Sequence, residues 1–229
     1  MTASGLERIL PGMCCFSGPV KRVADTHIFA RMTAPGTQAV VYSMLLDTKS
    51  EVAMILPIPV KPGSGEKAVR FLDFSACEDF FVALNLGFPG PGFGGGGPKT
   101  AREAAPQLEV QSVGSFDASF VPTVADFSRL DERFRLPAKT WDQLPAYADH
   151  GFVVFKLKAG NARVHPMAFT FPTRDATQLF FPTVHVHDGK VHATATFDHL
   201  LYAQGRIAGA TRWRRPRLRS RRAGRRRRM

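Results

Sequence analysis

The side chains best suited to chemistry are histidines grouped in the last quarter of the chain. Four of the seven histidines fall within fifteen residues, namely His185, His187, His192 and His199. Asp188 and Gly189 lie between His187 and His192, and Asp-Gly is a strong signal for a two-residue β-hairpin turn. Two strands joined there would place His185 opposite His192, with His187 beside them on the first strand.

Such a hairpin predicts a metal site, because successive side chains point to opposite faces of a strand. Val184, Val186 and Val191 then share the core face, and the three histidines His185, His187 and His192 share the other. Their Cβ atoms would lie about 5–7 Å apart. Converging imidazoles bind Zn²⁺ or another transition metal, and Asp198, Cys14, Cys15 or a water would complete the shell. The alternative is an ordinary polar face of a half-buried sheet, and a one-residue slip would reverse the faces.

The adjacent cysteines Cys14 and Cys15 are the second feature with chemical potential. Neighbouring thiols rarely form a disulfide because the ring is strained, but they bind soft metals or react when the local field lowers a thiol pKa. If translation starts at Met13, removal of that methionine leaves Cys14 with a free α-amino group. A thiol next to its own amine can act as nucleophile and base, as in an N-terminal-nucleophile hydrolase or amidase. The alternative is two small buried hydrophobic residues.

The net charge of +12 comes from the end of the chain. Residues 205–229 contain twelve arginines and no acidic residue, which leaves 19 Lys and Arg against 19 Asp and Glu in residues 1–204. Arginine mixed with Ala, Gly, Pro and Leu is what GC-rich codons yield in an unselected reading frame. We therefore expect this segment to be a disordered tail that is a frameshift product. The alternative is a genuine arm that binds nucleic-acid phosphates with steep salt dependence.

Composition places the protein in the cytoplasm. The first twenty residues lack the charged start and apolar run of a secretory signal, and no stretch approaches eighteen apolar residues. Three cysteines do not make a disulfide framework, which favours a reducing compartment. We expect no membrane partner, and nucleic acid is expected as a partner only if the tail is genuine.

The pattern of apolar residues predicts strands over most of the chain. We expect a hairpin of residues 27–32 and 38–46 turning at Pro35-Gly36, then a strand over 51–60 whose two prolines place its second half at a sheet edge. Further strands are expected over 68–74, 108–113, 116–121, 152–158, 164–171, 178–187 and 190–198. Helices are expected from a Ser75/Glu78 capping box to Leu86, over 128–134, and from Pro137 to before Gly151. This order predicts an α+β fold: one domain with a mainly antiparallel sheet and a few short helices.

Three segments carry a resemblance to a known family: MCCFS at 13–17, ILPIPV at 55–60 and FPTVHVHDG at 181–189. With these segments the chain resembles a family of uncharacterised bacterial proteins over roughly residues 13–204. The resemblance implies that Met13 is the true start and that residues 1–12 and the tail lie outside the domain. It implies no catalytic residue and no activity.

The sequence therefore predicts an N-terminal extension at 1–12 that is not translated, a globular domain at 13–204 and the tail at 205–229. The expected function is metal binding through His185, His187 and His192, with Cys14, Cys15 or Asp198 as further ligands. The two alternatives are a hydrolase or amidase with Cys14 as its nucleophile, and an interaction protein whose tail binds nucleic acid. The sequence leaves open whether the protein is an enzyme, and the metal-binding interpretation leans toward a binding protein.

Overall fold

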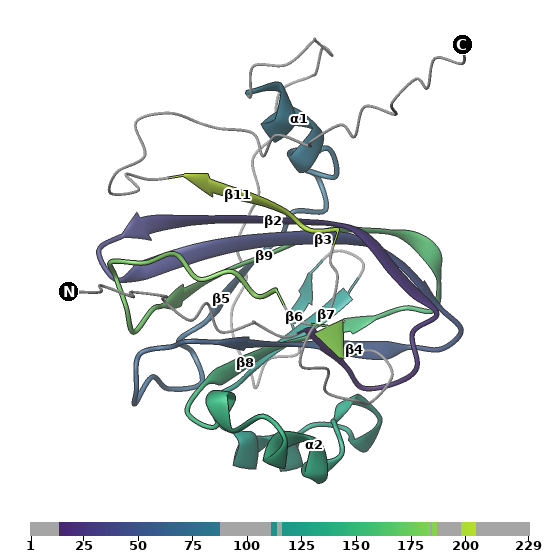
Figure 1. The fold of residues 1–229 in the computed structure, drawn as a ribbon, viewed down its shortest axis with the longest axis vertical. Helices are drawn as coiled ribbons and strands as arrows, with labels where there is room; N and C mark the ends of the chain where they lie inside the picture. Colours follow the sequence, from purple (N-terminus) through teal and green to yellow (C-terminus); the bar gives the residue numbers. More distant parts are fainter. Residues whose placement is uncertain (1–13, 88–110, 114–115, 184, 187–197, 205–229) are drawn as a thin grey trace, which may run out of the picture.

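Two β-sheets stacked face to face form the body of the molecule (Figure 1). The computed structural model describes residues 14–87, 111–113, 116–183, 185–186 and 198–204. In this part of the chain strands greatly outnumber helices, and nearly every strand pair is antiparallel. The predicted sheet-rich, mainly antiparallel architecture with a few short helices is therefore confirmed.

The first sheet has six strands among the described residues, in the spatial order β10-β1-β4-β8-β7-β6. Their bounds are β1 (Cys14–Phe16), β4 (Val52–Ile58), β6 (Gln111–Val113), β7 (Phe116–Val121), β8 (Gly151–Leu157) and β10 (His185–Val186). All neighbours are antiparallel except β1 and β10, which run parallel.

The second sheet has five strands in the same part of the chain, in the order β11-β2-β3-β9-β5. Their bounds are β2 (Arg22–Ala34), β3 (Thr37–Thr48), β5 (Arg70–Leu72), β9 (Gly160–Pro172) and β11 (Leu200–Gln204). The long β2–β3 hairpin and β9 make up most of it, and β11 runs parallel to β2. Gly36 has φ +72° at the turn of the hairpin, which is the left-handed conformation that such turns require.

The helices are short. They are α1 (Phe80–Leu86) and α2 (Ala138–Asp142), with the 3₁₀ segments η1 (Val124–Arg129), η2 (Glu132–Phe134) and η3 (Pro145–Tyr147). Helix α1 lies on one side of the stacked sheets and α2 on the other (Figure 1). Among the residues described, no helix has the length and apolar character needed to cross a membrane.

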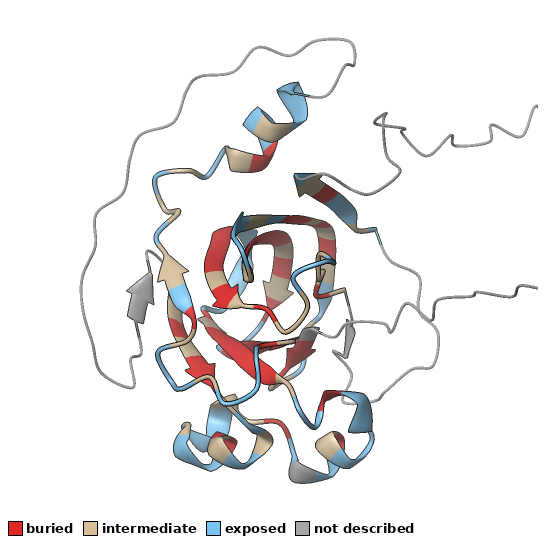
Figure 2. Ribbon diagram, turned by 90° about the vertical axis from the view of Figure 1, so that its left-hand side faces the viewer, coloured by how far each residue is buried: buried red, intermediate tan, exposed pale blue. Residues whose placement is uncertain are grey.

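The main core fills the space between the two sheets, where buried residues gather in Figure 2. Alternate residues of the first sheet, such as Met54 and Phe155, meet alternate residues of the second, such as Tyr42 and Phe169, and all four are fully buried. Full burial of an apolar side chain of this size contributes about 1.5–3 kcal/mol. The alternation of apolar residues along β3, β4 and β8 thus places both sheets against a common core.

The outer face of each sheet is covered as well. On the first sheet, Ile55 and Phe152 pack beneath Phe127 of η1 and Tyr147 of η3. On the second sheet, Phe29 and Val41 pack beneath Phe81 of α1 in a separate apolar cluster. The molecule is therefore layered as helix, sheet, sheet and helical segment (Figures 1 and 2).

Most predicted strands are present with small shifts at their ends. The hairpin over 27–32 and 38–46 corresponds to β2 and β3, and the strands over 116–121, 152–158 and 164–171 correspond to β7, β8 and β9. The strand over 68–74 is shorter, at Arg70–Leu72. The predicted strand over 108–113 is described only from Gln111 onward, as β6.

The strand predicted over 178–187 is wrong for residues 178–183. These residues form no strand, and only His185–Val186 pair in β10. The backbone of Phe180 is hydrogen-bonded by the buried Gln38 side chain and not by a neighbouring strand. Gln38 Nε2 donates to the Phe180 carbonyl at 2.7 Å, and the Phe180 backbone amide donates to Gln38 Oε1 at 3.0 Å. The apolar pattern at 178–183 therefore reflects packing against the sheets and not strand pairing.

The strand predicted over 51–60 also needs correction, because β4 is an interior strand with all seven residues buried. Its register with β8 continues through Pro57 and Ile58. On its other side β1 pairs only with Met54 and Ile55, so Pro57 lies beyond the described end of β1. The proline is tolerated because the partner strand on that side is short.

The three predicted helical regions are helical in the described structure, but their bounds and helix types differ. The Ser75/Glu78 capping box does not form: α1 starts at Phe80, and the Ser75 amide donates instead to the Asp73 carboxylate at 2.9 Å. The helix predicted over 128–134 is replaced by the two 3₁₀ segments η1 and η2. The helix predicted after Pro137 ends at Asp142 and is followed by η3.

Several predictions fall outside the described residues. These are the turn at Asp188-Gly189, nearly all of the strand over 190–198, the extension at 1–12 and the tail at 205–229. Strand β11, by contrast, was not predicted at all, although its Tyr202 is buried against α1.

Replacement of Gly151 by alanine is expected to destabilise the fold by about 1–3 kcal/mol, the usual result of overfilling a packed core. A Cβ atom at Gly151, the first residue of β8, would lie 2.6 Å from the buried Phe120 ring and 3.0 Å from Val60. Urea unfolding of the full chain measures the effect.

Gly65→Ala is the matched control, because a Cβ atom there meets nothing within 4 Å. It should leave the free energy of unfolding unchanged or slightly raised. Equal stability of Gly151→Ala and Gly65→Ala would contradict the packing described for the start of β8.

Candidate functional site

Strand β1 brings together two residues that the sequence singled out separately. In the parallel pair of β1 and β10, Cys14 is the register partner of His185, and Cys15 is the partner of Val186. Register partners in neighbouring strands lie about 4.8 Å apart across the ladder. The backbones of a cysteine and a histidine at opposite ends of the chain are thus adjacent.

The position of β1 is fixed by its other neighbour, β4. Cys15 pairs with Ile55 and Phe16 with Met54 in antiparallel register. Beyond the strand, the Ser17 amide donates to the Ala53 carbonyl at 2.9 Å, and the Ala53 amide donates to the Ser17 hydroxyl at 2.9 Å. These bonds fix the register of β1, and hence the level at which Cys14 meets β10.

The side chain of Cys15 lies in an apolar environment. It is fully buried in the cluster between the first sheet and η3, together with Ile55 and Tyr147. Burial raises the pKa of Tyr147 to about 12, and the neighbouring Cys15 thiol adds to the increase. The dry surroundings of Cys15 suit a packing role better than a role as ligand or nucleophile.

The remaining predicted ligands are not gathered at β1 in the part of the chain that the structure describes. His187 and His192 lie outside the described residues, so the expected pairing of His185 with His192 does as well. Within the described ranges, no group of three His, Cys, Asp or Glu side chains is arranged to hold a metal ion. Asp198 is described, and it contacts the second sheet.

Asp198 belongs to an ionic cluster on β2 that sequence reasoning missed. Its carboxylate accepts a hydrogen bond from the Asp25 amide at 2.5 Å. The Asp25 carboxylate accepts from His27 Nε2 at 2.9 Å and from the Arg163 guanidinium. These contacts connect β2 to β9 and to Asp198, two residues before β11. Asp198 is thus bonded to the second sheet, whereas Cys14 lies in the first.

Backbone geometry explains why Asp25 can make these contacts. Asp25 has φ +51°, the one positive φ of a non-glycine residue in the described chain, and it lies in a β-bulge between Ala24 and His27. Aspartate is among the few residues that adopt this conformation readily. The hydrogen bond from Arg163 is the main cause that lowers the pKa of Asp25, and the bond from His27 adds to it.

Asp25 and His27 are residue types that often form a catalytic acid–base pair, but their contacts here are those of a structural pair. His27 packs edge-on against Phe81 with ring centroids 5.2 Å apart. Its Nδ1 atom is buried, with no hydrogen-bond partner among the described residues. Arg163 compensates the Asp25 charge. Ser43, the register partner of His27 on β3, donates its hydroxyl to the Val164 carbonyl at 3.0 Å. These contacts join strands β2, β3 and β9.

His165 and His150 make contacts typical of structural histidines. His165 is buried on β9 and stacks on Phe116 with ring centroids 4.5 Å apart. His150 Nδ1 is 2.9 Å from the Asp149 carboxylate, which also accepts from Arg174. Burial is the largest effect on the pKa of His150 and lowers it, while the hydrogen bond with Asp149 opposes this shift.

Comparison with known proteins adds little. No family model matches the chain, and no curated protein matches it. Among solved structures, the chain is similar to the crystal structure of baculovirus P35, with 13% identity, a TM-score of 0.38 and coverage of 70% of this chain. The match spans 58% of that protein's chain, less than two thirds of its length. The resemblance to uncharacterised bacterial proteins stays a prediction.

Asp25→Asn is expected to destabilise the protein by about 0.5–1 kcal/mol at pH 7, since the Asp25 side chain is half exposed. Asparagine keeps the positive φ but removes the charge that Arg163 stabilises. The pKa of Asp25 is lower in the folded state than the unfolded value of about 4. Its contribution should therefore be complete above about pH 5 and be lost as the pH falls through the folded-state pKa.

Urea unfolding of both proteins at pH 7 and near pH 3 measures this difference, which should shrink at the lower pH. Asp142→Asn, at the exposed end of α2, serves as control and should change stability little at either pH. A destabilisation by Asp25→Asn of the same size at both pH values would show that its charge is not the cause.

Proposed function

We propose that the protein binds a transition metal ion, Zn²⁺ in the first instance, with Cys14 and His185 as two of the ligands. The observation that supports this is the register of β1 and β10, in which these two residues are partners. A thiolate and an imidazole are the ligand types that zinc and neighbouring transition metals favour.

The spacing of the two backbones suits one ion. Neighbouring strands are about 4.8 Å apart, while Zn–S and Zn–N bonds measure about 2.3 Å and 2.0 Å. Register partners can therefore contribute to one tetrahedral site without any distortion of the ladder. His187 and His192, which the hairpin pattern places near His185, are proposed as the other two ligands.

Cys15 and Asp198 fit the site less well than the sequence suggested. Cys15 is fully buried among apolar side chains, and Asp198 accepts the Asp25 amide on the second sheet. A site of one cysteine and three histidines would fill all four positions around zinc. Filled positions are typical of a structural or storage site and not of a catalytic one.

The same register also favours a second candidate, a hydrolase or amidase with Cys14 as its nucleophile. An imidazole next to a thiol lowers the thiol pKa and accepts its proton. Both candidates place the protein in the cytoplasm, where a reducing environment preserves a thiol. The nucleic-acid candidate depends on residues 205–229 alone, which lie outside the described chain.

Zinc binding by the full chain, followed by isothermal titration in the absence of chelators, tests the proposal. We expect one Zn²⁺ per chain. Cys14→Ser and His185→Ala should each weaken binding by more than about 100-fold, the upper end of what loss of a ligand's own hydrogen-bond partner costs.

Cys77→Ser and His150→Gln are the matched controls, since Cys77 lies beside α1 and His150 is bonded to Asp149. Both should bind zinc as tightly as the unaltered protein. Failure to bind zinc, or binding that survives Cys14→Ser and His185→Ala, would refute the metal site. Rapid alkylation of Cys14 that needs His185 and no metal would favour the nucleophile instead.

A further inference from the structure

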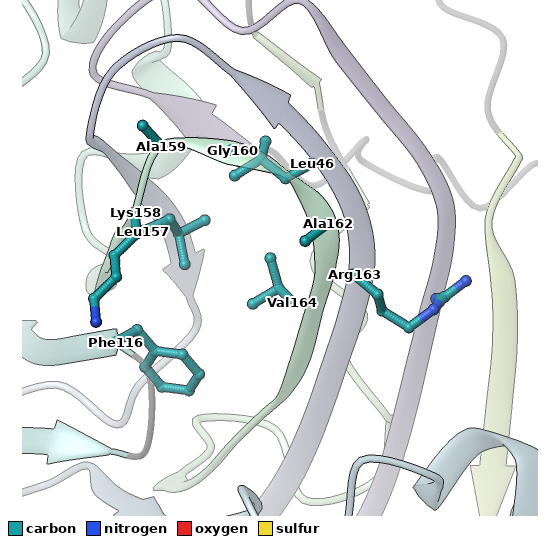
Figure 3. Close-up of a pocket in the computed structure, with 9 residues that line it drawn as sticks. All are labelled: Leu46, Phe116, Leu157, Lys158, Ala159, Gly160, Ala162, Arg163 and Val164. Atoms are coloured by element: carbon teal, nitrogen blue, oxygen red, sulfur yellow. The ribbon is translucent and has the colours of Figure 1, made fainter.

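A small hollow opens between the two sheets at the end where β8 turns into β9 (Figure 3). Its volume is about 150 Å³. Its lining includes Leu46, Phe116, Leu157 and Val164, whose side chains point into it from four strands or their ends (Figure 3). A cavity of this size and apolar character holds a group the size of a benzene ring.

The walls of the hollow are held in place before any ligand arrives. The Phe116 ring packs edge-on against Phe155, with centroids 5.3 Å apart, and stacks on the buried His165 at 4.5 Å. Leu46 and Leu157 are both buried in the main core. A preformed apolar wall lowers the entropic cost of binding, because its own side chains do not have to be ordered when the ligand enters.

The charge at the rim is positive. Lys158 and Arg163 both belong to the lining, but the Arg163 guanidinium turns away from the hollow and pairs with Asp25 (Figure 3). The Lys158 side chain runs along the opening toward Phe116 (Figure 3). No carboxylate is paired with Lys158 among the described residues, and none is part of the lining.

We propose that this hollow binds a small organic anion that combines a compact apolar group with one carboxylate. The apolar group fills the space between Leu46, Phe116 and Val164, and the carboxylate lies at the opening beside the Lys158 ammonium. The volume is too small to enclose a nucleotide or a long acyl chain. The site is distinct from the proposed metal site, because its described lining comes from β3, β7, β8, β9 and the turn between β8 and β9, whereas Cys14 and His185 lie on β1 and β10.

Benzoate and its neutral counterpart benzamide are the probes, titrated into the full chain by NMR or calorimetry. Benzoate should bind about fivefold more tightly than benzamide, the advantage that one exposed charge pair supplies. Lys158→Met keeps the length of the side chain but removes its charge. It should abolish the preference for benzoate and leave benzamide binding unchanged.

Two further variants test the location. Ala162→Phe at the exposed rim and Val164→Phe in the wall should each fill the hollow and weaken both probes at least tenfold. Ala162 is exposed, so its replacement leaves the core intact if Val164→Phe fails to fold. Lys156→Met is the charge control, because Lys156 pairs with Glu51 and lies over the Phe134 ring.

The proposal is overturned if neither probe binds, if both bind equally well, or if binding survives filling of the hollow. It is also overturned if Lys156→Met removes the preference for benzoate as fully as Lys158→Met. Removal of zinc should leave benzoate binding unchanged, so this test and the metal test fail independently.

Discussion

Burial of β4 and β8 on both faces is the constraint on which the rest of the structure depends. Their inward side chains, Met54 and Phe155 among them, meet the second sheet, and their outward side chains, Ile55 and Phe152, meet the helical segment over 124–147. Every residue of β4 is buried. Strands covered on both sides carry near-continuous apolar runs and cannot shift register without exposing them. The neighbouring strands therefore pair with strands whose register is fixed.

The packing of strand β1 against β4 fixes the position of one residue of the candidate site, Cys14. Phe16 enters the core between the sheets, while Cys15 enters the apolar cluster on the outer face. A shift of one residue would turn Phe16 out of the core between the sheets and toward the opposite face, so packing holds β1 in a single register against β4. Because β1 is held in this way, Cys14 occupies a defined level of the sheet beside His185.

Local pattern predicted much of the fold but little of the site. The alternating β2–β3 hairpin and strands β7, β8 and β9 were recognisable because their apolar period is local. The second half of the strand over 51–60 was predicted to lie at a sheet edge because of its two prolines, although the continuous apolar run VAMILPI is typical of a strand covered on both faces. Strands β1 and β11 are short, and their partners β10 and β2 are distant in sequence, so no local signal marks them. The pairing of Cys14 with His185 and the ionic cluster at Asp25 depend on such long-range register.

X-ray absorption at the zinc edge tests the central claim, that Cys14 and His185 share one metal ion, most directly. For the zinc-loaded full chain we predict a first shell with one sulfur at about 2.3 Å and nitrogen ligands at about 2.0 Å. The sulfur contribution should disappear in Cys14→Ser and persist in Cys77→Ser. A shell of oxygen and nitrogen alone in the unaltered protein, or a sulfur contribution that persists without Cys14, would contradict the account.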